Sequence, residues 1–224
     1  MLVFFLLAAC CFGQTDYALM LAAAKRSDPN REPHQRASDV LLAAQIKSGD
    51  SAADTGAGSG YYTGRLSGMV GPTVREFAVE VSETSLGVLR ERVRTDGLKN
   101  GAVVRAEPGD PHLDAAASLD AVLIVDAYHD FVQDQGMLQQ THKALKPGGR
   151  LVIADYFSPQ ADNQPRENQA RRHVLAPSLA VEELRRAGFA VEKLEDPFLE
   201  RKPEAKGSHI AEAALWLLTA IRPL

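Results

Sequence analysis

A nearly continuous apolar run from Leu119 to Asp126 constrains the fold of this chain more than any other feature. It reads Leu-Asp-Ala-Val-Leu-Ile-Val-Asp and lacks a regular alternation of apolar and polar residues. Strands with this pattern are buried on both faces, as in parallel sheets that helices cover. Parallel strands also need long crossover connections, which are usually helices. The run therefore predicts an α/β sheet with helices on both sides.

Strand and helix patterns alternate along the rest of the chain. We expect strands over 50–55, 77–81, 102–106, 119–126, 150–156, 189–194 and 213–221, with a helix over 211–220 as the alternative to the last. We expect helices over 17–25, 37–46, 61–70, 83–96, 135–145 and 178–187, the last capped by Ser178. The alternation predicts a doubly wound, Rossmann-like α/β fold. Residues 26–36 read as an irregular linker, and 158–176 as a long polar loop of the kind that forms lids or binding loops.

The composition narrows the classes of function. The 224 residues include 25 Lys and Arg against 29 Asp and Glu, which gives a net charge of −4. General binding to nucleic acid needs a concentrated basic face, so no nucleic-acid partner is expected. The only cysteines, Cys10 and Cys11, are adjacent, which excludes a disulfide framework or a cysteine zinc cluster. No metal site is evident in the sequence, and a small molecule is the default ligand.

The chain begins with an apolar leader, Met1 to Gly13. It is too short for a membrane-spanning helix, which needs about 20 residues. It resembles the apolar region of a secretory signal, and Leu7-Ala8-Ala9-Cys10 resembles a lipoprotein signal, although no Lys or Arg precedes the run. We predict a leader over 1–16, a helical segment and linker over 17–36, and the main domain over 37–224. Export or lipid attachment to a bacterial membrane, and a cytoplasmic chain with a mis-assigned start, both stay open, as does the oligomeric state.

A glycine-rich segment follows the first strand of the main domain. Asp54-Thr55-Gly56-Ala57-Gly58-Ser59-Gly60 lies between a predicted strand and a predicted helix. Glycines there let the backbone turn tightly and let a ligand approach it. In a doubly wound sheet this is the edge at which ligands bind, and a carboxylate such as Glu80, after the next strand, can accept hydrogen bonds from ribose hydroxyls. The two features predict a nucleoside-cofactor site.

The spacing of the glycines distinguishes between cofactors. Dinucleotide sites favour G-x-G-x-x-G and a P-loop needs Gly-Lys-Ser/Thr. This chain has G-x-G-x-G, with Tyr61 where the third dinucleotide glycine would stand. S-adenosylmethionine, which carries adenosine without a pyrophosphate, is the alternative.

Three features of the chain resemble those of the class I S-adenosylmethionine-dependent methyltransferases. The glycine-rich segment, Glu80 and Leu145-Lys146-Pro147-Gly148-Gly149-Arg150-Leu151 carry the resemblance, which runs from about residue 37 to residue 199. Asp126-Ala127-Tyr128-His129-Asp130 resembles a segment of a bacterial subgroup whose members are often predicted to carry signal sequences. The resemblance implies a seven-stranded, mostly parallel sheet with helices on both faces.

The same resemblance implies roles for individual residues. The glycine-rich segment would hold the methionine end of S-adenosylmethionine, with Asp54 near its amino group, and Glu80 would hold the ribose. Glu107 would lie near the adenine, with Asp110 as the alternative. In full, the predicted cofactor-binding residues are Asp54, Gly56, Ala57, Gly58, Gly60, Glu80, Val81, Glu107, Asp126 and Ala127.

Two departures from the family pattern stand out. Thr55 replaces the usual bulky aliphatic residue, and Thr73-Val74-Arg75-Glu76 places charge at the entry to the second strand. Neither touches the proposed cofactor contacts. Both are expected to weaken the sheet locally.

The resemblance implies methyl transfer to an unidentified, small-molecule acceptor. His129 is predicted as a catalytic base, with Tyr128 as a second catalytic candidate. A base is needed only if the acceptor must lose a proton, and His is the usual one near neutral pH. Packing or a local hydrogen bond is the simpler interpretation of His129, and packing or a wall of the cofactor site is the simpler one of Tyr128. Solvent exposure is the simpler interpretation of His173 in the polar loop. A non-catalytic S-adenosylmethionine- or S-adenosylhomocysteine-binding protein of the same fold is the alternative. The glycine spacing argues against a nucleotide-dependent reductase.

Overall fold

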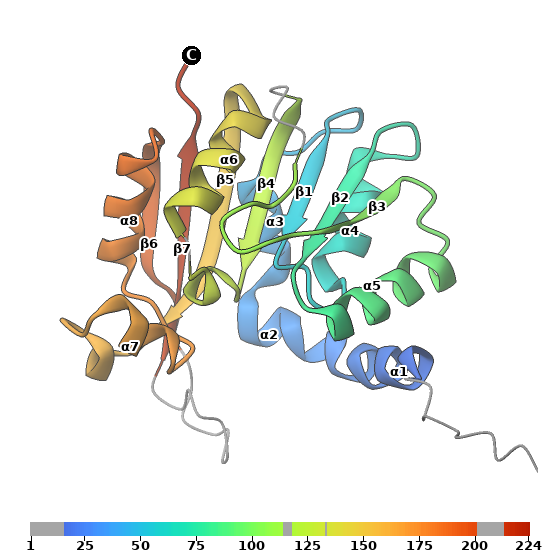
Figure 1. Cartoon of the computed structure of the whole chain (residues 1–224), viewed down its shortest axis with the longest axis horizontal. Helices are drawn as coiled ribbons and strands as arrows, with labels where there is room; N and C mark the ends of the chain where they lie inside the picture. Colours follow the sequence, from blue (N-terminus) through green and yellow to red (C-terminus); the bar gives the residue numbers. More distant parts are fainter. Residues whose placement is uncertain (1–15, 114–117, 133, 201–212) are drawn as a thin grey trace, which may run out of the picture.

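A computed structural model describes residues 16–113, 118–132, 134–200 and 213–224. In these residues one seven-stranded sheet has the order β3-β2-β1-β4-β5-β7-β6 (Figure 1). β7 pairs antiparallel with both of its neighbours, and the other pairings are parallel. The strands are β1 (Ala52–Thr55), β2 (Glu76–Glu80), β3 (Gly101–Arg105), β4 (Leu119–Val125), β5 (Leu145–Phe157), β6 (Ala190–Leu199) and β7 (Ala214–Ile221). The predicted fold class is confirmed.

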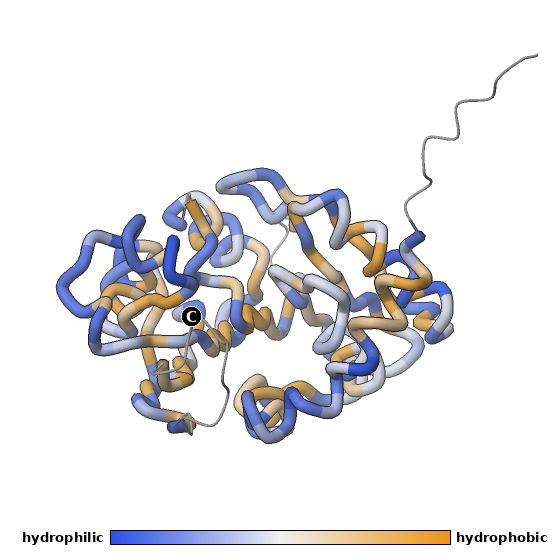
Figure 2. The backbone as a smooth tube through the Cα atoms, turned by 90° about the horizontal axis from the view of Figure 1, so that it is seen from below, coloured by the Kyte–Doolittle hydropathy of each residue, from blue (hydrophilic) through white to orange (hydrophobic). Residues whose placement is uncertain are grey.

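Helices cover both faces of this sheet. They are α1 (Tyr17–Ser27), η1 (Asp28–Asn30), α2 (Arg31–Gln35), α3 (Ala37–Ala43), α4 (Tyr61–Val70), α5 (Glu83–Thr95), η2 (Tyr128–Asp130), α6 (Asp134–Ala144), η3 (Pro159–Ala161), α7 (Arg166–Ala170) and α8 (Pro177–Arg186). α3 and α4 pack with one apolar cluster, and α6 and α8 with another. Seen from below, hydrophobic stretches of the backbone lie mostly toward the inside of the molecule and hydrophilic ones mostly at its edge (Figure 2).

The apolar run of β4 explains how two cores form on one sheet. Leu123 and Val125 belong to the cluster with α3 and α4, whereas Val122 and Ile124 belong to the cluster with α6 and α8. Successive side chains of a strand point to opposite faces, so a strand covered on both sides must be apolar at nearly every position. The central strand therefore joins the two apolar layers.

The segment predicted as a linker is helical. Residues 26–36 contain the end of α1, then η1 and α2, and they pack on the main domain. Tyr17 lies against Gly87 of α5, where an added Cβ would come within 2.1 Å of the tyrosine ring. Arg92 of α5 forms an ion pair with Asp28 at 2.9 Å. Tertiary contacts stabilise short helices that their own propensity does not.

The other differences are local. Helix α8 begins at Pro177 with Ala176 as its N-cap, and not with Ser178 as cap. The segment predicted as a loop over 158–176 contains η3 and α7, and the last strand pattern forms β7 and not a helix. Within the described residues no helix is long and apolar enough to cross a membrane. The predicted leader over 1–16 lies outside the described residues except for Asp16, which caps α1.

Candidate functional site

The glycine-rich segment forms a tight turn between β1 and α4. Gly56, Gly58 and Gly60 have φ of +78°, +55° and +81°, a region that residues with a Cβ rarely adopt. The backbone N–H groups of Gly56 and Ala57 donate to the carbonyl of Val79 at 2.9 and 3.0 Å, which ties the turn to β2. The turn therefore has a fixed shape at the carboxyl edge of the sheet.

The three glycines differ in their surroundings. A Cβ on Gly56 would come within 2.5 Å of the Ala127 Cβ, and one on Gly60 within 2.7 Å of a methyl group of Leu89. A Cβ on Gly58 would meet no atom within 4 Å. Packing therefore requires glycine at the first and third positions, whereas Gly58 leaves open space beside its backbone.

Glu80 braces the same turn. One of its carboxylate oxygens accepts from the Gly58 N–H at 2.8 Å, and the other accepts from Val81 and Ser82 N–H groups at 2.8 and 2.9 Å. The side chain is buried at the end of β2. Each carboxylate oxygen has two lone pairs, so Glu80 keeps room for one further donor, on the oxygen that accepts from Gly58.

A cavity of about 160 Å³ opens beside the turn. It lies between the ends of β1 and β2, the chain after β3, and the chain around η2 and α6. Its lining includes Gly56, Glu80, Val81, Glu107, Asp130 and Met137. Four of the predicted cofactor-binding residues therefore share one cavity.

Two further acids lie near the turn, Asp54 buried and Asp126 half-buried. Burial raises the pKa of Asp54 to about 6, although hydrogen bonds from Thr63, one of them at 2.7 Å from its hydroxyl, oppose the shift. Burial, with Asp155 adding to it, also raises the pKa of Asp126 to about 6. Asp126 accepts a hydrogen bond from Gln35 of α2 at 3.3 Å. The two carboxyls are costly to ionise as they stand.

A histidine cluster follows β4. His129 is buried, and its Nδ1 lies 2.8 Å from an oxygen of the fully buried Asp155 of β5. Its Nε2 lies 3.4 Å from Asp130 and 3.3 Å from His173 Nδ1. Burial lowers the pKa of His129, but the hydrogen bonds with Asp130 and Asp155 outweigh it and raise this pKa to about 10.

The comparisons with known proteins agree with this geometry. A family profile described as a methyltransferase domain matches residues 53–151. The Ubiquinone/menaquinone biosynthesis C-methyltransferase UbiE of Klebsiella pneumoniae is 24% identical over 114 residues, 51% of this chain and 45% of that protein. Methyltransferase GfsG of Streptomyces halstedii is 30% identical over 131 residues, 57% of this chain and 46% of that protein. The chain thus spans about half the length of the curated relatives it matches.

Solved structures show the same fold. A SAM-dependent methyltransferase from Aquifex aeolicus superposes with a TM-score of 0.70 at 23% identity, over 93% of this chain and 99% of that one. Geranyl diphosphate C-methyltransferase from Streptomyces coelicolor, solved with S-adenosyl-L-homocysteine, gives 0.68 at 13% identity, over 84% and 75%. The chain therefore has the fold of the class I S-adenosylmethionine-dependent methyltransferases, and residues 53–151 match the family profile of a methyltransferase domain.

The structure distinguishes Glu107 from Asp110, the two candidates for the adenine contact, by their positions. Glu107 lines the cavity. The Asp110 carboxylate instead accepts the His112 N–H at 2.8 Å, inside the turn that joins residues 107 and 110. Glu107 is therefore the better placed of the two, and its contact with adenine stays a prediction.

The structure argues against a catalytic role for Tyr128. Its side chain is fully buried, and its hydroxyl donates to Glu183 of α8 at 2.5 Å. A side chain enclosed in this way cannot touch an acceptor. His129 is also poorly placed as a base, because both ring nitrogens have partners and its raised pKa keeps it protonated near neutral pH.

Sequence reasoning missed several residues around the glycine turn and η2. Gln35 and Arg31 come from the segment predicted as a linker, and Asp155 lies inside a strand. Arg31 lowers the pKa of both Asp54 and Asp126 through its charge. No local pattern marks these residues, since Gln35 and its partner Asp126 lie 91 positions apart.

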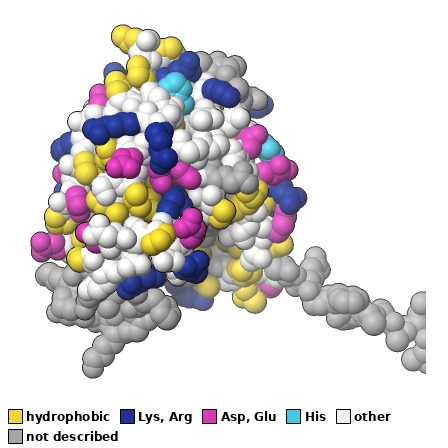
Figure 3. Space-filling view, turned by 60° about the vertical axis from the view of Figure 1, so that its left-hand side comes forward, with side chains coloured by type: hydrophobic (Ala, Val, Ile, Leu, Met, Phe, Trp, Pro, Cys, Tyr) yellow, Lys and Arg dark blue, Asp and Glu magenta, His cyan; other side chains and the backbone are white. Residues whose placement is uncertain are grey.

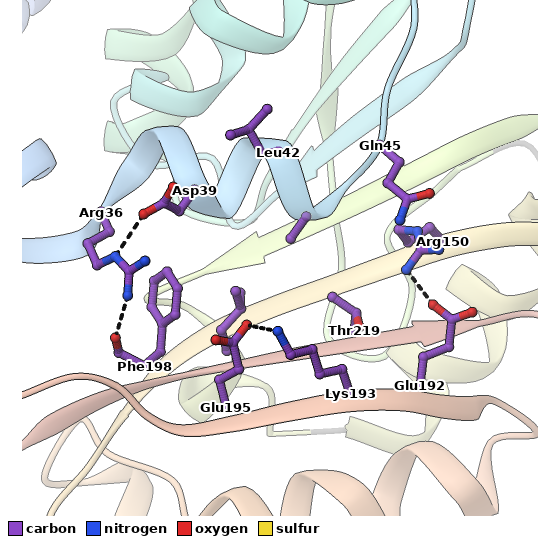
Figure 4. A pocket seen from close by; sticks show the side chains of 12 residues that line it. Arg36, Asp39, Leu42, Gln45, Arg150, Glu192, Lys193, Glu195, Phe198 and Thr219 are labelled. Carbon is purple, nitrogen blue, oxygen red and sulfur yellow. Dashed lines mark hydrogen bonds and ion pairs between the residues drawn. The ribbon is translucent and has the colours of Figure 1, made fainter.

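A larger cavity lies elsewhere among the described residues. It measures about 510 Å³ between α3 and strands β5, β6 and β7 (Figure 4). Its charged side chains pair with one another: Arg36 with Asp39 at 2.8 Å, Lys193 with Glu195 at 2.9 Å, and Arg150 with Glu192. No predicted site residue lines it. The smaller cavity beside the glycine turn is therefore the candidate cofactor site.

Proposed function

We propose that this protein transfers the methyl group of S-adenosylmethionine to a small-molecule acceptor. The observation that carries the proposal is the glycine turn braced by Glu80 beside a cavity. This combination suits a nucleoside whose ribose hydroxyls donate to a carboxylate. The methyltransferase-domain profile that matches residues 53–151 supports the same function.

The two acids near the turn fit the charge of this cofactor. Asp54 and Asp126 are carboxyls whose burial raises their pKa to about 6. A cation bound near them would favour their ionised forms and offset the cost of burying them. S-adenosylmethionine carries an ammonium and a sulfonium, so it would place positive charge beside these two acids.

The chain's own residues would divide the work of binding. Glu80 would accept a hydrogen bond from a ribose hydroxyl while it holds the turn. Val81, which is 55% exposed, and Glu107 would bound the adenosine. Gly58, whose Cα faces open space, would let the ligand approach the backbone. Asp54 would receive the ammonium, and Asp126 and Ala127 would lie along the cofactor.

When bound, S-adenosylmethionine would supply a methyl group carried on a positively charged sulfur, with S-adenosylhomocysteine as the leaving group. The protein's part is to hold the acceptor in line with the bond between that sulfur and the methyl group and to keep water out, and positioning of this kind supplies much of the acceleration. His129 does not enter this scheme as a base.

Two observations favour a small molecule as the acceptor. Several relatives are named for ubiquinone/menaquinone biosynthesis, and one structural neighbour is named a geranyl diphosphate C-methyltransferase. On the face shown in Figure 3, basic and acidic side chains are interspersed. Such a mixture does not favour a polyanionic partner.

Calorimetric titration of the full chain with S-adenosylmethionine, S-adenosylhomocysteine and NADH tests the proposal. We expect the first two to bind and NADH not to bind. Glu80→Ala should weaken S-adenosylmethionine binding by about 1.5–3 kcal/mol, roughly 10- to 150-fold, because a charge-assisted hydrogen bond is lost. Glu83→Ala is the matched control, since Glu83 is exposed and pairs with Arg105 on the surface.

Each other result has a definite meaning. Equal dissociation constants for the Glu80 and Glu83 variants would remove Glu80 from the site. Transfer of labelled methyl to a panel of small acceptors completes the test. Binding without transfer to any of them would favour the non-catalytic binding protein, and binding of NADH alone would favour a reductase.

A further inference from the structure

His129, Asp130 and His173 bring three metal-binding atoms together outside the glycine turn. Among the described residues, this group and one made of Asp126, His129 and Asp155 have the composition and spacing for a metal ion. In the second group the nearest ring nitrogen of His129 is already hydrogen-bonded to Asp155 at 2.8 Å. The first group uses the other ring nitrogen, so it is the stronger candidate.

The three donor atoms form a nearly regular triangle. His129 Nε2 lies 3.3 Å from His173 Nδ1 and 3.4 Å from the Asp130 carboxylate, and the third side measures 3.7 Å. A tetrahedral zinc ion with ligands at about 2.0–2.1 Å has ligand atoms about 3.3–3.4 Å apart. The triangle therefore matches one face of such a tetrahedron with little movement of the side chains.

Asp155 supplies the outer support that a metal-binding histidine needs. It is fully buried, accepts from the His129 backbone N–H at 2.8 Å, and contacts His129 Nδ1 at 2.8 Å. Metal-ligating histidines usually donate their second N–H to a carboxylate, which fixes the ring and its tautomer. This contact leaves Nε2 as the nitrogen directed at the cluster.

The cluster joins two segments that are distant in sequence. Arg166 of α7 donates to the backbone carbonyls of Tyr128 and His129 at 3.1 and 3.4 Å, which ties the segment before His173 to η2. His173 has φ of +53°, and its ring meets that of His129 edge to face with centroids 5.3 Å apart. The chain thus holds His173 beside His129 with a positive φ, which few residues other than glycine adopt.

We propose that His129, Asp130 and His173 bind a divalent cation of the zinc type, with the fourth position open to water or to an oxygen of the acceptor. Two histidines and a carboxylate with an open position are a common catalytic zinc set. Asp130 also lines the cavity assigned to the cofactor, so the cation would lie next to that cavity. The inference rests on the cluster itself and does not require methyl transfer.

Metal titration of the full chain tests this site. After dialysis against a chelator, Zn²⁺ is titrated by calorimetry, and Co²⁺ by visible absorption, which reports tetrahedral coordination. Cys10→Ser with Cys11→Ser serves as the background, so that thiol binding in the leader does not enter the result. We expect one ion per chain at this site, with at least tenfold weaker binding in His173→Asn.

Two further variants distinguish an effect on the proposed metal site from a general loss of Zn²⁺ binding. Asp155→Asn leaves all three ligands in place and should weaken Zn²⁺ binding about 10- to 100-fold through the outer support. His34→Asn, at an exposed histidine of α2, should leave it unchanged. Circular dichroism checks that each variant is folded.

The proposal is overturned if wild type and His173→Asn bind Zn²⁺ equally, or if neither binds it. Titration with S-adenosylmethionine on the same samples keeps this result separate from the proposed activity. Cofactor binding without Zn²⁺ binding would remove the cation site alone, and Zn²⁺ binding without cofactor binding would remove the methyltransferase proposal alone.

Discussion

Glu76 offers a sharp test of how this sheet tolerates a buried acid. It begins β2, its side chain is fully buried, and neither carboxyl oxygen has a hydrogen-bond partner among the described residues. Burial, with a smaller contribution from Asp54, raises the pKa of Glu76 well above its usual value. This is the charged entry to the second strand that the sequence singled out as a local weakness.

The cost follows from these contacts. A buried polar group left without a partner costs about 1–3 kcal/mol. Because the folded-state pKa is raised, Glu76 keeps its proton in the folded protein after the unfolded chain has released it. Stability therefore falls as pH rises above the unfolded pKa, by at most about 1.4 kcal/mol per pH unit, and the fall ends once the folded-state pKa is passed.

Glu76→Met and Glu76→Gln separate the cost of the unsatisfied carboxyl group from the pH-dependent cost of its raised pKa. Methionine has a similar length and no group to ionise or satisfy, so it should stabilise the protein by about 1–3 kcal/mol at pH 5 and by more at pH 8. Glutamine should reduce the pH dependence but keep most of the unsatisfied-polar cost. For a chain of this size each kcal/mol is worth roughly 2–4 °C in Tm.

Urea unfolding of wild type and both variants at pH 5 and pH 8 measures these differences. S-adenosylmethionine binding should not change, since Glu76 and Glu80 lie at opposite ends of β2. A Met variant that is less stable than wild type at both pH values would refute the reasoning, because it would mean that the carboxyl has stabilising partners.

Three further outcomes are expected. Gly58→Val should abolish S-adenosylmethionine binding in calorimetry yet fold, with a stability loss of about 1–2 kcal/mol from its positive φ, because a Cβ there meets no protein atom; normal binding would mean that the turn does not approach the ligand. Affinity for S-adenosylmethionine should rise between pH 5 and pH 7 as Asp54 ionises around its pKa of about 6, and Asp54→Asn should flatten that rise; an identical pH profile in the variant would contradict the role. Tyr128→Phe should cost about 1–2 kcal/mol of stability in urea unfolding, since it removes the hydroxyl bonded to buried Glu183, and leave the turnover of folded protein unchanged; a selective loss of turnover would restore its catalytic role.

The fold was largely predictable because its signals are local. Helix α4 covers Tyr61–Val70 as predicted, since Gly60 and Gly71 bound it. The β4 pattern likewise predicted burial on both faces. The last strand was ambiguous because residues 211–220 favour a helix by propensity, and only pairing with β5 and β6 decides it.

The site was only partly predictable, for the opposite reason. The glycine turn and Glu80 follow their strands directly, so spacing places them together. Gln35 contacts Asp126, and Asp155 contacts His129, although the two residues of each pair lie far apart in the sequence. No local pattern predicts such contacts. The helices within residues 26–36 were not predicted because prolines and charged residues in this segment disfavour a helical pattern. Tertiary contacts such as the ion pair of Arg92 with Asp28 stabilise them.

The segment that carries Gln35 has a thermodynamic consequence. The stretch from α1 to α2 packs on α5 and also contacts Asp126 through Gln35. A ligand that changes the charge at Asp126 therefore changes the free energy with which this stretch docks. Linkage makes the effect reciprocal, so docking of the stretch must change ligand affinity by the same factor. In this protein, hydrogen exchange of residues 17–35 would report on occupancy of the cofactor site.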